Sequence, residues 1–312
     1  MIFLCIFAFL NLSAGMNDNI VTLTTDWGNS DNYAAIFKAH LYRENSDIKI
    51  IDVTHDVKKN TIIDAAFSVK TMYSHFPKNS IHIVDVNFIA HHNERKYREV
   101  LKKEHSVESL NFTHYLAFDF DEHYFLCENN GIIPLLCDIN QIKTIVKLSP
   151  DDKYTDFRSF KAIPYLVKAA AKLAKGNPLN SIGENYNIDS IEMSKMPMAF
   201  ISHGQKDRII FHSQHIDSYG NIITNLHKDL FDKVADGRTL FDFYCTETGI
   251  KNKCRISTDY NDKHKSDDQF ILLFGYSRYL EIAARYAPIA KLLRAEFFNM
   301  EFTINFPPKI KE

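Results

Sequence analysis

The sequence predicts an α/β domain with a largely parallel sheet, followed by a smaller all-β, barrel-like domain. Three observations support this fold class. The chain has 312 residues, which is more than one typical domain holds. Between residues 20 and 176, apolar strand-like runs alternate with helical patterns. After about residue 190 the pattern changes to short strand-like runs separated by turn signals. We therefore expect an α/β domain at residues 16–180, a linker at 181–195 and a β domain at 196–312.

The first domain is expected to contain parallel βαβ units. Its elements, in chain order, are strand 20–25, helix 31–45, strand 47–55, helix 61–76, strand 77–87, a hairpin of 114–120 with 123–129, and helix 159–176. The hairpin turn is expected at Asp121–Glu122. Residues 87–113 are polar and charged, and their length is typical of a functional loop.

The second domain is expected to be a small sandwich or barrel of short strands. The candidate strands are residues 198–204, 208–216, 222–227, 239–249, 253–259 and 269–276. No internal repeat and no low-complexity tract interrupts them.

Composition argues against several classes of function. Lys and Arg total 37 and Asp and Glu total 39, so the formal net charge is −2, whereas a nucleic-acid-binding face shows as a basic excess. Nucleic acid is therefore not an expected partner. The five cysteines are odd in number and contain no CxxC pair. They indicate reduced thiols in a cytoplasmic protein, without a disulfide framework or a zinc site.

The first 15 residues, MIFLCIFAFLNLSAG, allow two interpretations. They are apolar and end in small residues, as a signal peptide does, which predicts export. No Lys or Arg precedes the apolar run, however, and Met16 stands just before the first strand, which favours an over-extended start and a cytoplasmic protein. The segment is too short to span a bilayer as a helix. We exclude it from the fold and expect no stable membrane association.

The segment TTDWGNSDN places two acids after the first strand. In parallel α/β sheets, ligands bind outside the carboxyl ends of the strands, where an acid can accept both ribose hydroxyls. Asp26 lies at such an end, and Gly28 next to it leaves room for a ligand. The alternative is structural, with Asp26 in a turn and Asp31 as a helix N-cap. The segment contains neither GxGxxG nor a P-loop, so it does not predict a site for a pyrophosphate or triphosphate.

Polar residues also follow the second and third strands. His55 ends the second strand, where a lone histidine is more often a turn or packing residue. After the third strand come Asn87 and then His91, His92, Glu94 and Arg95. Adjacent histidines in a loop do not converge on one ion, so we expect no metal site.

In the second half, the segment IDSYGNIITNL concentrates polar and aromatic residues at one turn. Asp217 could hold an ammonium group, Tyr219 could stack on a base, and Asn221 could pair with an adenine edge. The alternative is a plain β-turn around Tyr-Gly-Asn.

Six segments occur in an order and spacing that resemble one family. They are TLTTDWGNSDNY, IIDVTHDV, DAAFSVKTMYSHFPKNSIHIVDVN, CENNGII, IDSYGNIITN and GYSRYLEIA. The chain resembles the S-adenosyl-L-methionine (SAM) hydroxide adenosyltransferases, or SAM hydrolases, which are relatives of the SAM-dependent fluorinase and chlorinase. The resemblance covers residues 19 to about 305.

The resemblance implies a homotrimer that binds SAM between the N-terminal domain of one subunit and the C-terminal domain of the next. Water, as hydroxide, would attack C5′ of SAM and yield adenosine and L-methionine, with SAM as substrate and no cofactor. Carried over by position, Asp26 is the ribose acid, Asp31 is the second acid of that motif, and Asp217 faces the methionine ammonium. The remaining matches are the adenine-contacting Tyr219 and Asn221 and the methionine-carboxylate loop Tyr276, Ser277 and Arg278.

The positions that activate water in the family differ in this chain. An Asp expected after the third strand is replaced by Asn87, the expected Arg matches Arg95 only after a one-residue shift, and the expected His is replaced by Phe157. Three interpretations stay open at this point. They are a catalytic site rearranged around His91, His92 or Arg95, an enzyme that works by placement alone, and a protein that binds SAM or adenosine without turnover.

Overall fold

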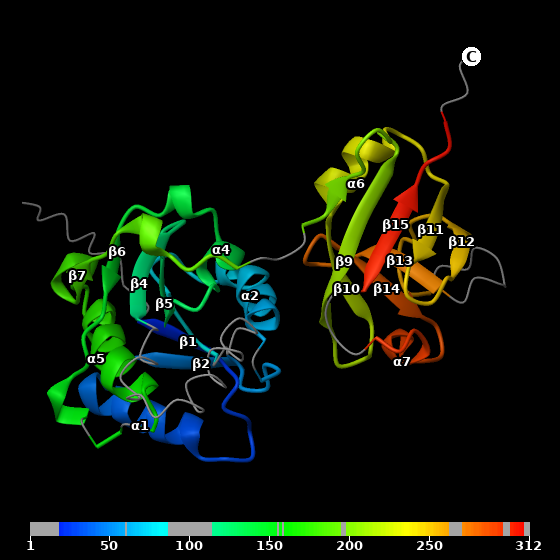
Figure 1. Cartoon of the computed structure of the whole chain (residues 1–312). Helices are drawn as coiled ribbons and strands as arrows, with labels where there is room; N and C mark the ends of the chain where they lie inside the picture. Colours follow the sequence, from blue (N-terminus) through cyan, green and yellow to red (C-terminus); the bar gives the residue numbers. More distant parts are fainter. Residues whose placement is uncertain are drawn as a thin grey trace, which may run out of the picture. The chain divides into compact units, whose positions relative to one another are not determined.

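The computed structural model describes residues 19–59, 61–86, 114–154, 156–157, 159–194, 198–261, 270–295 and 300–308. The chain divides into two compact units, unit 1 at residues 1–192 and unit 2 at residues 193–312 (Figure 1). The predicted domain limits at residues 180 and 196 stay predictions. No helix in the described part of the chain is long and apolar enough to cross a membrane.

Unit 1 is built on a mixed seven-stranded sheet in the order β2-β1-β3-β5-β4-β6-β7. The strands are β1 (Ile20–Thr25), β2 (Lys49–Thr54), β3 (Ile81–Asp85), β4 (Tyr115–Phe120), β5 (His123–Glu128), β6 (Ile145–Lys147) and β7 (Glu184–Asn185). The pairings β2–β1, β1–β3 and β3–β5 are parallel, and the other three are antiparallel. The expected parallel arrangement is thus found in four strands, and the sheet as a whole is mixed.

A tight hairpin accounts for the antiparallel pairing of β4 with β5. β4 and β5 are joined by Asp121 and Glu122, which both have positive φ angles, 49° and 63°. Two consecutive residues with positive φ form the turn that suits a two-residue hairpin, and such a turn can join only antiparallel strands. The predicted turn position is confirmed.

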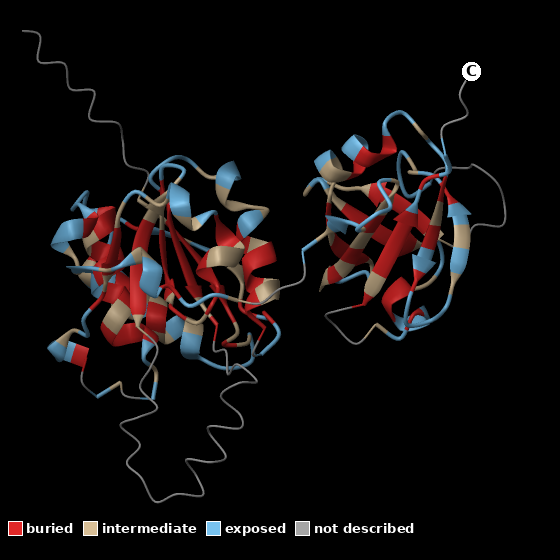
Figure 2. Cartoon of the chain, turned by 45° about the horizontal axis from the view of Figure 1, so that its top comes forward, coloured by how far each residue is buried: buried red, intermediate tan, exposed pale blue. Residues whose placement is uncertain are grey.

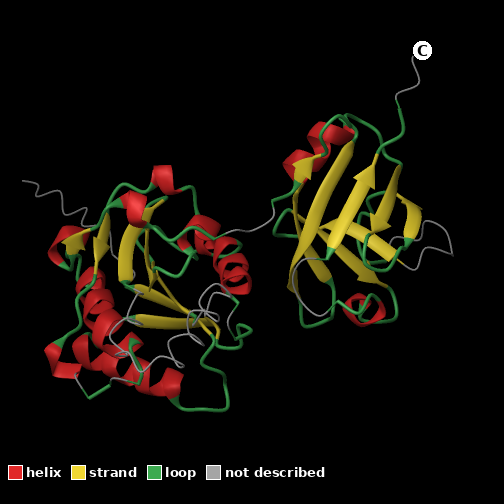
Figure 3. Ribbon diagram, in the orientation of Figure 1, coloured by secondary structure: helices red, strands yellow, loops and turns green. Residues whose placement is uncertain are grey.

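Helices cover both faces of this sheet (Figure 3). Helices α1 (Tyr33–Glu44) and α5 (Ala162–Ala174) pack with residues of β1, β3 and β4 in one core cluster. Helices α2 (Ile62–Lys70) and α4 (Ile133–Leu136) pack in a second cluster on the other face. Short 3-10 segments complete the unit: η1 (Tyr73–His75), η3 (Ile139–Gln141), η4 (Asp152–Tyr154), η5 (Leu179–Ser181) and η6 (Ile188–Ser190).

Unit 2 is an all-antiparallel, barrel-like β structure. Its strands follow the order β12-β11-β15-β9-β10-β14-β13, and β8 pairs with β9. They are β8 (Phe200–Ile201), β9 (Arg208–Ile216), β10 (Ile222–His227), β11 (Phe241–Cys245), β12 (Lys251–Cys254), β13 (Phe270–Phe274), β14 (Tyr279–Ala284) and β15 (Glu301–Asn305). After β12, the Ser257 N–H donates to the Leu272 carbonyl on β13 at 2.7 Å, which brings the two ends of the strand order together.

Buried residues line the strands of unit 2 (Figure 2), and aromatic residues are prominent in its core. Phe211, Phe243 and Phe302 stack in a row, with ring centroids 5.7 Å apart in each neighbouring pair. Two helices, α6 (Lys228–Ala235) and α7 (Ile289–Leu292), pack on the strands. The sequence prediction missed β14, β15 and α6, so it found only part of this unit.

A buried pair of histidines joins three strands of unit 1. His82 on β3 and His123 on β5 are fully buried, and their Nε2 and Nδ1 atoms lie 3.2 Å apart. The Nδ1 atom of His82 forms a second hydrogen bond, at 2.8 Å, with the Thr22 hydroxyl on β1. Burial and the neighbouring His123 lower the pKa of His82 to about 3, so the pair folds in the neutral form.

We therefore predict that unit 1 loses stability as the pH falls from 6.5 toward 3, because only the unfolded chain then protonates at His82. Between pH 7 and 5 the loss from His82 is about 2 kcal/mol, and a His82→Gln variant lacks it. Urea unfolding followed by fluorescence of Trp27, the chain's only tryptophan, measures this difference. His75→Gln, at an exposed histidine of the same unit, is the control. Equal pH dependence in the wild type and His82→Gln would contradict the prediction.

Candidate functional site

Three acids meet at the carboxyl ends of β1, β3 and β5. Thr25 pairs with Asp85, so Asp26 emerges from β1 directly beside the end of β3. On the other side of β3, Val84 pairs with Cys127, so the next residues, Asp85 and Glu128, lie alongside each other. This is the edge of a parallel sheet at which ligands bind.

Asp85 is the central acid, and each of its carboxylate oxygens has a named donor. The Trp27 indole N–H donates to Oδ2 at 2.8 Å, and the Tyr115 hydroxyl donates to Oδ1 at 2.9 Å. Although part of the residue remains accessible, protein atoms surround the carboxylate, and this burial raises the pKa of Asp85 to about 7. The charges of Glu128 and Asp26 act in the same direction, and the two hydrogen bonds oppose it.

The predicted ribose acid, Asp26, is partly buried and begins a tight loop. Gly28, with φ +80°, donates its N–H to the His55 carbonyl at 2.7 Å. The left-handed backbone at this position suits glycine. Asp31, the second acid, is exposed, and the N-cap of α1 is Asn32.

His55 contributes to packing at this edge. Its ring is buried, stacks on Trp27 with centroids 5.9 Å apart, and forms a 2.7 Å hydrogen bond with the Thr25 hydroxyl. Its surroundings agree with the packing role that the sequence favoured for it.

Phe157, which the resemblance aligns with a histidine, lies in an aromatic group. Its ring centroid is 4.9 Å from that of His40 and 6.2 Å from that of Tyr154, and the residue packs against the core under α1 and α5. A phenyl ring offers neither a donor nor an acceptor to a water molecule. Two other predicted catalytic residues, Asn87 and Arg95, lie outside the described residues, as do His91 and His92. Among the residues that are described, no group of three or more His, Cys, Asp or Glu could hold a metal ion.

In unit 2 the structure brings Asp217, Tyr219 and Asn221 together in one turn. Asp217 Oδ1 accepts the backbone N–H groups of Tyr219 at 3.0 Å and Asn221 at 2.8 Å, and its Oδ2 accepts the Asn221 side-chain amide at 2.9 Å. Oδ1 thus already accepts two hydrogen bonds, whereas Oδ2 keeps a second lone pair and can still accept from an ammonium. Tyr219 is 81% exposed and its ring can receive a stacked base.

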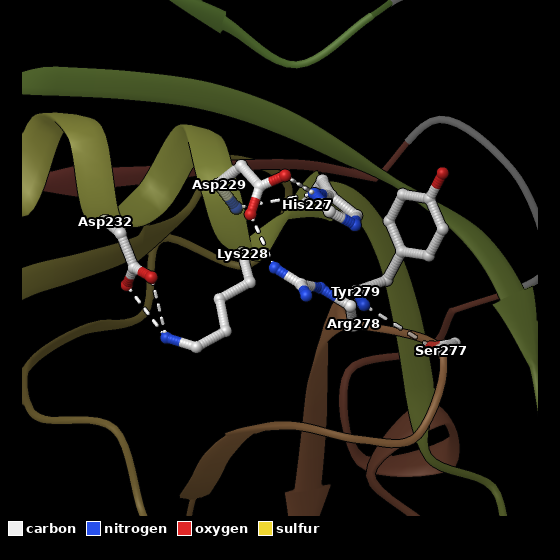
Figure 4. A network of polar contacts seen from close by, with 7 residues as sticks. All are labelled: His227, Lys228, Asp229, Asp232, Ser277, Arg278 and Tyr279. Carbon is white, nitrogen blue, oxygen red and sulfur yellow. Dashed lines mark hydrogen bonds and ion pairs between the residues drawn. The ribbon is translucent and has the colours of Figure 1, made fainter.

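The second predicted loop of unit 2, Tyr276–Arg278, is a turn between β13 and β14. Arg278 has φ +61° and donates its backbone N–H to the Gly275 carbonyl at 3.0 Å. Its guanidinium forms an ion pair with Asp229, at 2.6 Å, at the start of α6 (Figure 4). Both side chains are exposed, and exposed ion pairs contribute little, so a ligand carboxylate could replace Asp229 as the partner of Arg278.

Glu281, on β14, lies against the Gly275 turn and was missed in the sequence. It is buried, it accepts the Tyr260 hydroxyl, and a Cβ placed on Gly275 would lie 1.8 Å from its Oε1. Burial raises the pKa of Glu281, the Tyr260 hydrogen bond opposes this, and the charge of Asp217 adds to the rise. Its carboxylate thus lies against the Gly275 turn and within electrostatic reach of the Asp217 turn.

Asp85 and Glu128 were also missed, although a signal was present. Both acids end apolar strand-like runs, just as Asp26 follows the run that ends at Thr25. The reasoning from strand ends that selected Asp26 would have selected them too. Glu281 lacks such a signal, because it lies within the strand-like run YLEIAA.

Comparison with known proteins identifies relatives of both units. The family model described as SAM hydroxide adenosyltransferase N-terminal domain matches residues 21–183, and that of the C-terminal domain matches residues 212–298. The chain is 26% identical over 294 residues to an (R)-S-adenosyl-L-methionine hydrolase of Methanocaldococcus jannaschii, covering 90% of this chain and 94% of the relative.

Two solved structures share the fold. An uncharacterized conserved protein from Thermotoga maritima matches with a TM-score of 0.75 and 21% identity, over 92% of this chain and 100% of its own. A conserved hypothetical protein from Thermus thermophilus matches with a TM-score of 0.63 and 16% identity, over 91% and 98% of the two chains.

The contact between Glu281 and Gly275 leads to a prediction. A Gly275→Ala substitution should destabilise unit 2 by about 1–3 kcal/mol, because the buried Glu281 carboxylate occupies the space that the new methyl group needs. In a Glu281→Ala background the same substitution should cost clearly less. Calorimetric unfolding of the two single variants and the double variant measures this coupling. Equal costs in both backgrounds would show that the contact does not limit residue 275.

Proposed function

Because the chain belongs to the SAM hydroxide adenosyltransferase family, we propose that it hydrolyses SAM to adenosine and L-methionine. The observation that carries the proposal is the position of Asp85. It is a partly buried acid beside Asp26, at the edge of the sheet where ligands bind. The relative that is named a SAM hydrolase, 26% identical to this chain, supports the same reaction.

The proposed reaction is a single displacement at carbon. The water oxygen forms a bond to C5′ while the C5′–sulfur bond breaks, and the electron pair of that bond stays on sulfur as the methionine thioether. The water gives up one proton to a base. Because the sulfonium is already an activated leaving group, catalysis needs in-line placement and partial desolvation of the water. We therefore propose SAM as substrate and no cofactor.

We assign the role of base to Asp85. A general base is most effective when its pKa lies near the working pH, and burial raises the pKa of Asp85 to about 7. The sequence comparison placed the expected acid at Asn87, yet the residue that ends β3 is Asp85, two positions earlier. If the acid of the family pattern is aligned with the end of β3, Asp85 takes the place of the carboxylate that Asn87 lacks. The buried Oδ1 atom of Asn130 has no partner among the described residues and is an acceptor for water near the same strand end.

The ligand contacts follow the roles implied by the sequence. We propose Asp26 for the ribose hydroxyls, with Asp31 at the same loop, and Asp217 for the methionine ammonium. Tyr219 and Asn221 would contact adenine, and Tyr276, Ser277 and Arg278 would bind the methionine carboxylate. In support, the Asp217 turn and the Arg278 turn are both organised by hydrogen bonds within unit 2.

Phe157 favours a second candidate function, a protein that binds SAM or adenosine without turnover. Its ring is engaged with His40 and Tyr154 and has no polar atom for a water molecule. In this alternative the chain keeps the proposed ligand contacts. Catalysis has been lost because Phe157 stands where the resemblance implies a histidine.

We predict that Asp85→Asn lowers the rate of adenosine and methionine formation by at least about 100-fold while SAM still binds, because the amide cannot accept the proton. Chromatography measures the products and calorimetry the binding. Asp26→Ala is the contrasting variant and should weaken binding of both SAM and adenosine. Wild-type rates in Asp85→Asn would remove Asp85 as the base. Binding of SAM by the wild type without any product would favour the binding protein, and no binding of SAM or adenosine would contradict both functions.

We also propose the homotrimer that the resemblance implies, with each site shared between two subunits. In that case, mixing inactive Asp26→Ala chains with inactive Asp217→Ala chains should restore part of the wild-type activity after subunit exchange. In some mixed trimers, an intact unit 1 from the Asp217→Ala chain then shares a site with an intact unit 2 from the Asp26→Ala chain. Light scattering measures the oligomer, and product formation measures recovery. A monomer, or trimers without recovery, would contradict the shared site.

A further inference from the structure

We propose that Glu128 is a positioning residue that controls the protonation of Asp85. This inference rests on the proposed function only where it concerns hydrolysis. The pairing of the two carboxylates follows from the positions of the strand ends alone.

The sheet places Glu128 between Tyr115 and Asp85. Tyr115 on β4 pairs directly with Glu128, and the β3–β5 register that pairs Val84 with Cys127 continues to Asp85 and Glu128. All three side chains lie on one face, because the residues two positions along each strand, Ala117, Leu126 and Ile83, belong to a single core cluster. The Tyr115 hydroxyl reaches past Glu128 to Asp85 Oδ1 at 2.9 Å.

Asn130 ties the end of β5 to the end of β3. Its side-chain amide donates to the Val86 carbonyl at 3.0 Å and lies 3.4 Å from Glu128 Oε2. The Asn130 amide thus contacts both the Val86 carbonyl, next to Asp85, and the Glu128 carboxylate. This contact limits how far Glu128 can turn away from Asp85.

Charge is the means by which Glu128 acts. Among the charged groups around Asp85, Glu128 has the larger effect on its pKa and Asp26 the smaller, and both raise it. The donors Trp27 and Tyr115 oppose them. Two acids in one site cannot both ionise freely, so the pair retains one proton to a higher pH than either acid alone would.

The consequence for hydrolysis concerns the strength of the base. A carboxylate that shares its site with a second negative charge accepts a proton more readily, and one that ionises only near neutral pH is matched to a water nucleophile. Glu128 would thus act through Asp85 and need not touch the substrate.

The test uses Trp27, the only tryptophan of the chain, whose indole N–H donates to Asp85 Oδ2 at 2.8 Å. Its fluorescence should change with the ionisation of Asp85, with a midpoint near pH 7 in the wild type. In Glu128→Gln, which keeps the size of the side chain and removes its charge, the midpoint should fall by roughly one pH unit. The acidic limb of the pH dependence of kcat/KM should move by the same amount.

Three variants make the assignment specific. Asp85→Asn should abolish the transition, and His55→Asn should retain it, which separates Asp85 from the histidine stacked on Trp27. Glu122→Gln is the matched control, because it removes an exposed acid at the opposite end of β5, and its midpoint should equal that of the wild type.

The outcomes separate this inference from the proposed function. An unchanged midpoint in Glu128→Gln, or the same shift in Glu122→Gln, would overturn the role of Glu128 whether or not SAM is hydrolysed. A shifted midpoint in a protein that forms no adenosine would support the coupled pair and contradict the hydrolase. A folded Glu128→Gln protein is verified by its circular dichroism, and Glu128→Asp, which keeps the charge, should restore most of the wild-type midpoint.

Discussion

The organisation of unit 1 around its candidate site depends on one carboxylate. Asp85 ends β3 and accepts hydrogen bonds from Trp27, which follows β1, and from Tyr115, which begins β4. Trp27 in turn contacts Phe37 of α1, with ring centroids 5.2 Å apart, and Phe160, just before α5, at 4.9 Å. The acid is thus connected through one indole ring to both helices on that face of the sheet. Strand ends and helices are held in register around a group that is itself able to react.

Unit 2 uses carboxylates in a related way. Asp217 accepts three hydrogen bonds from its own turn, and Glu281 accepts the Tyr260 hydroxyl beside Gly275. A turn stabilised in this way changes little when a ligand binds, so less of the binding free energy is lost to ordering. The lone pair that remains on Asp217 Oδ2 belongs to a turn whose shape is already set, which suits a site for a small cationic group.

The sequence predicted the alternating half of the fold better than the β half. Apolar residues at helical spacing mark α2 and α5, and the Asp121–Glu122 hairpin has a clear turn pattern. The strand β15 was missed although its residues alternate between polar and apolar, and its register is set by distant partners on β9 and β11. The same limit applies to the site. Asp26 and Asp217 stand in recognisable motifs, whereas the partnership of Asp85 with Glu128 exists only after β5 has paired with β3, across a long polar insertion.

The raised pKa of Asp85 also costs folding stability, and this cost bears on function. An acid with a folded pKa of about 7 and an unfolded value near 3.9 is harder to ionise in the folded protein, so it destabilises the fold at neutral pH by on the order of 4 kcal/mol. Two hydrogen bonds from Trp27 and Tyr115 offset part of the cost of burying the charge, and the adjacent Glu128 and Asp26 increase it. An apolar residue at the end of β3 would avoid the whole cost. Costs of this kind are concentrated at functional sites, where a reactive group must be held in an environment that does not favour its charge. The placement of three acids at one sheet edge is therefore better explained by chemistry at that edge than by the needs of folding.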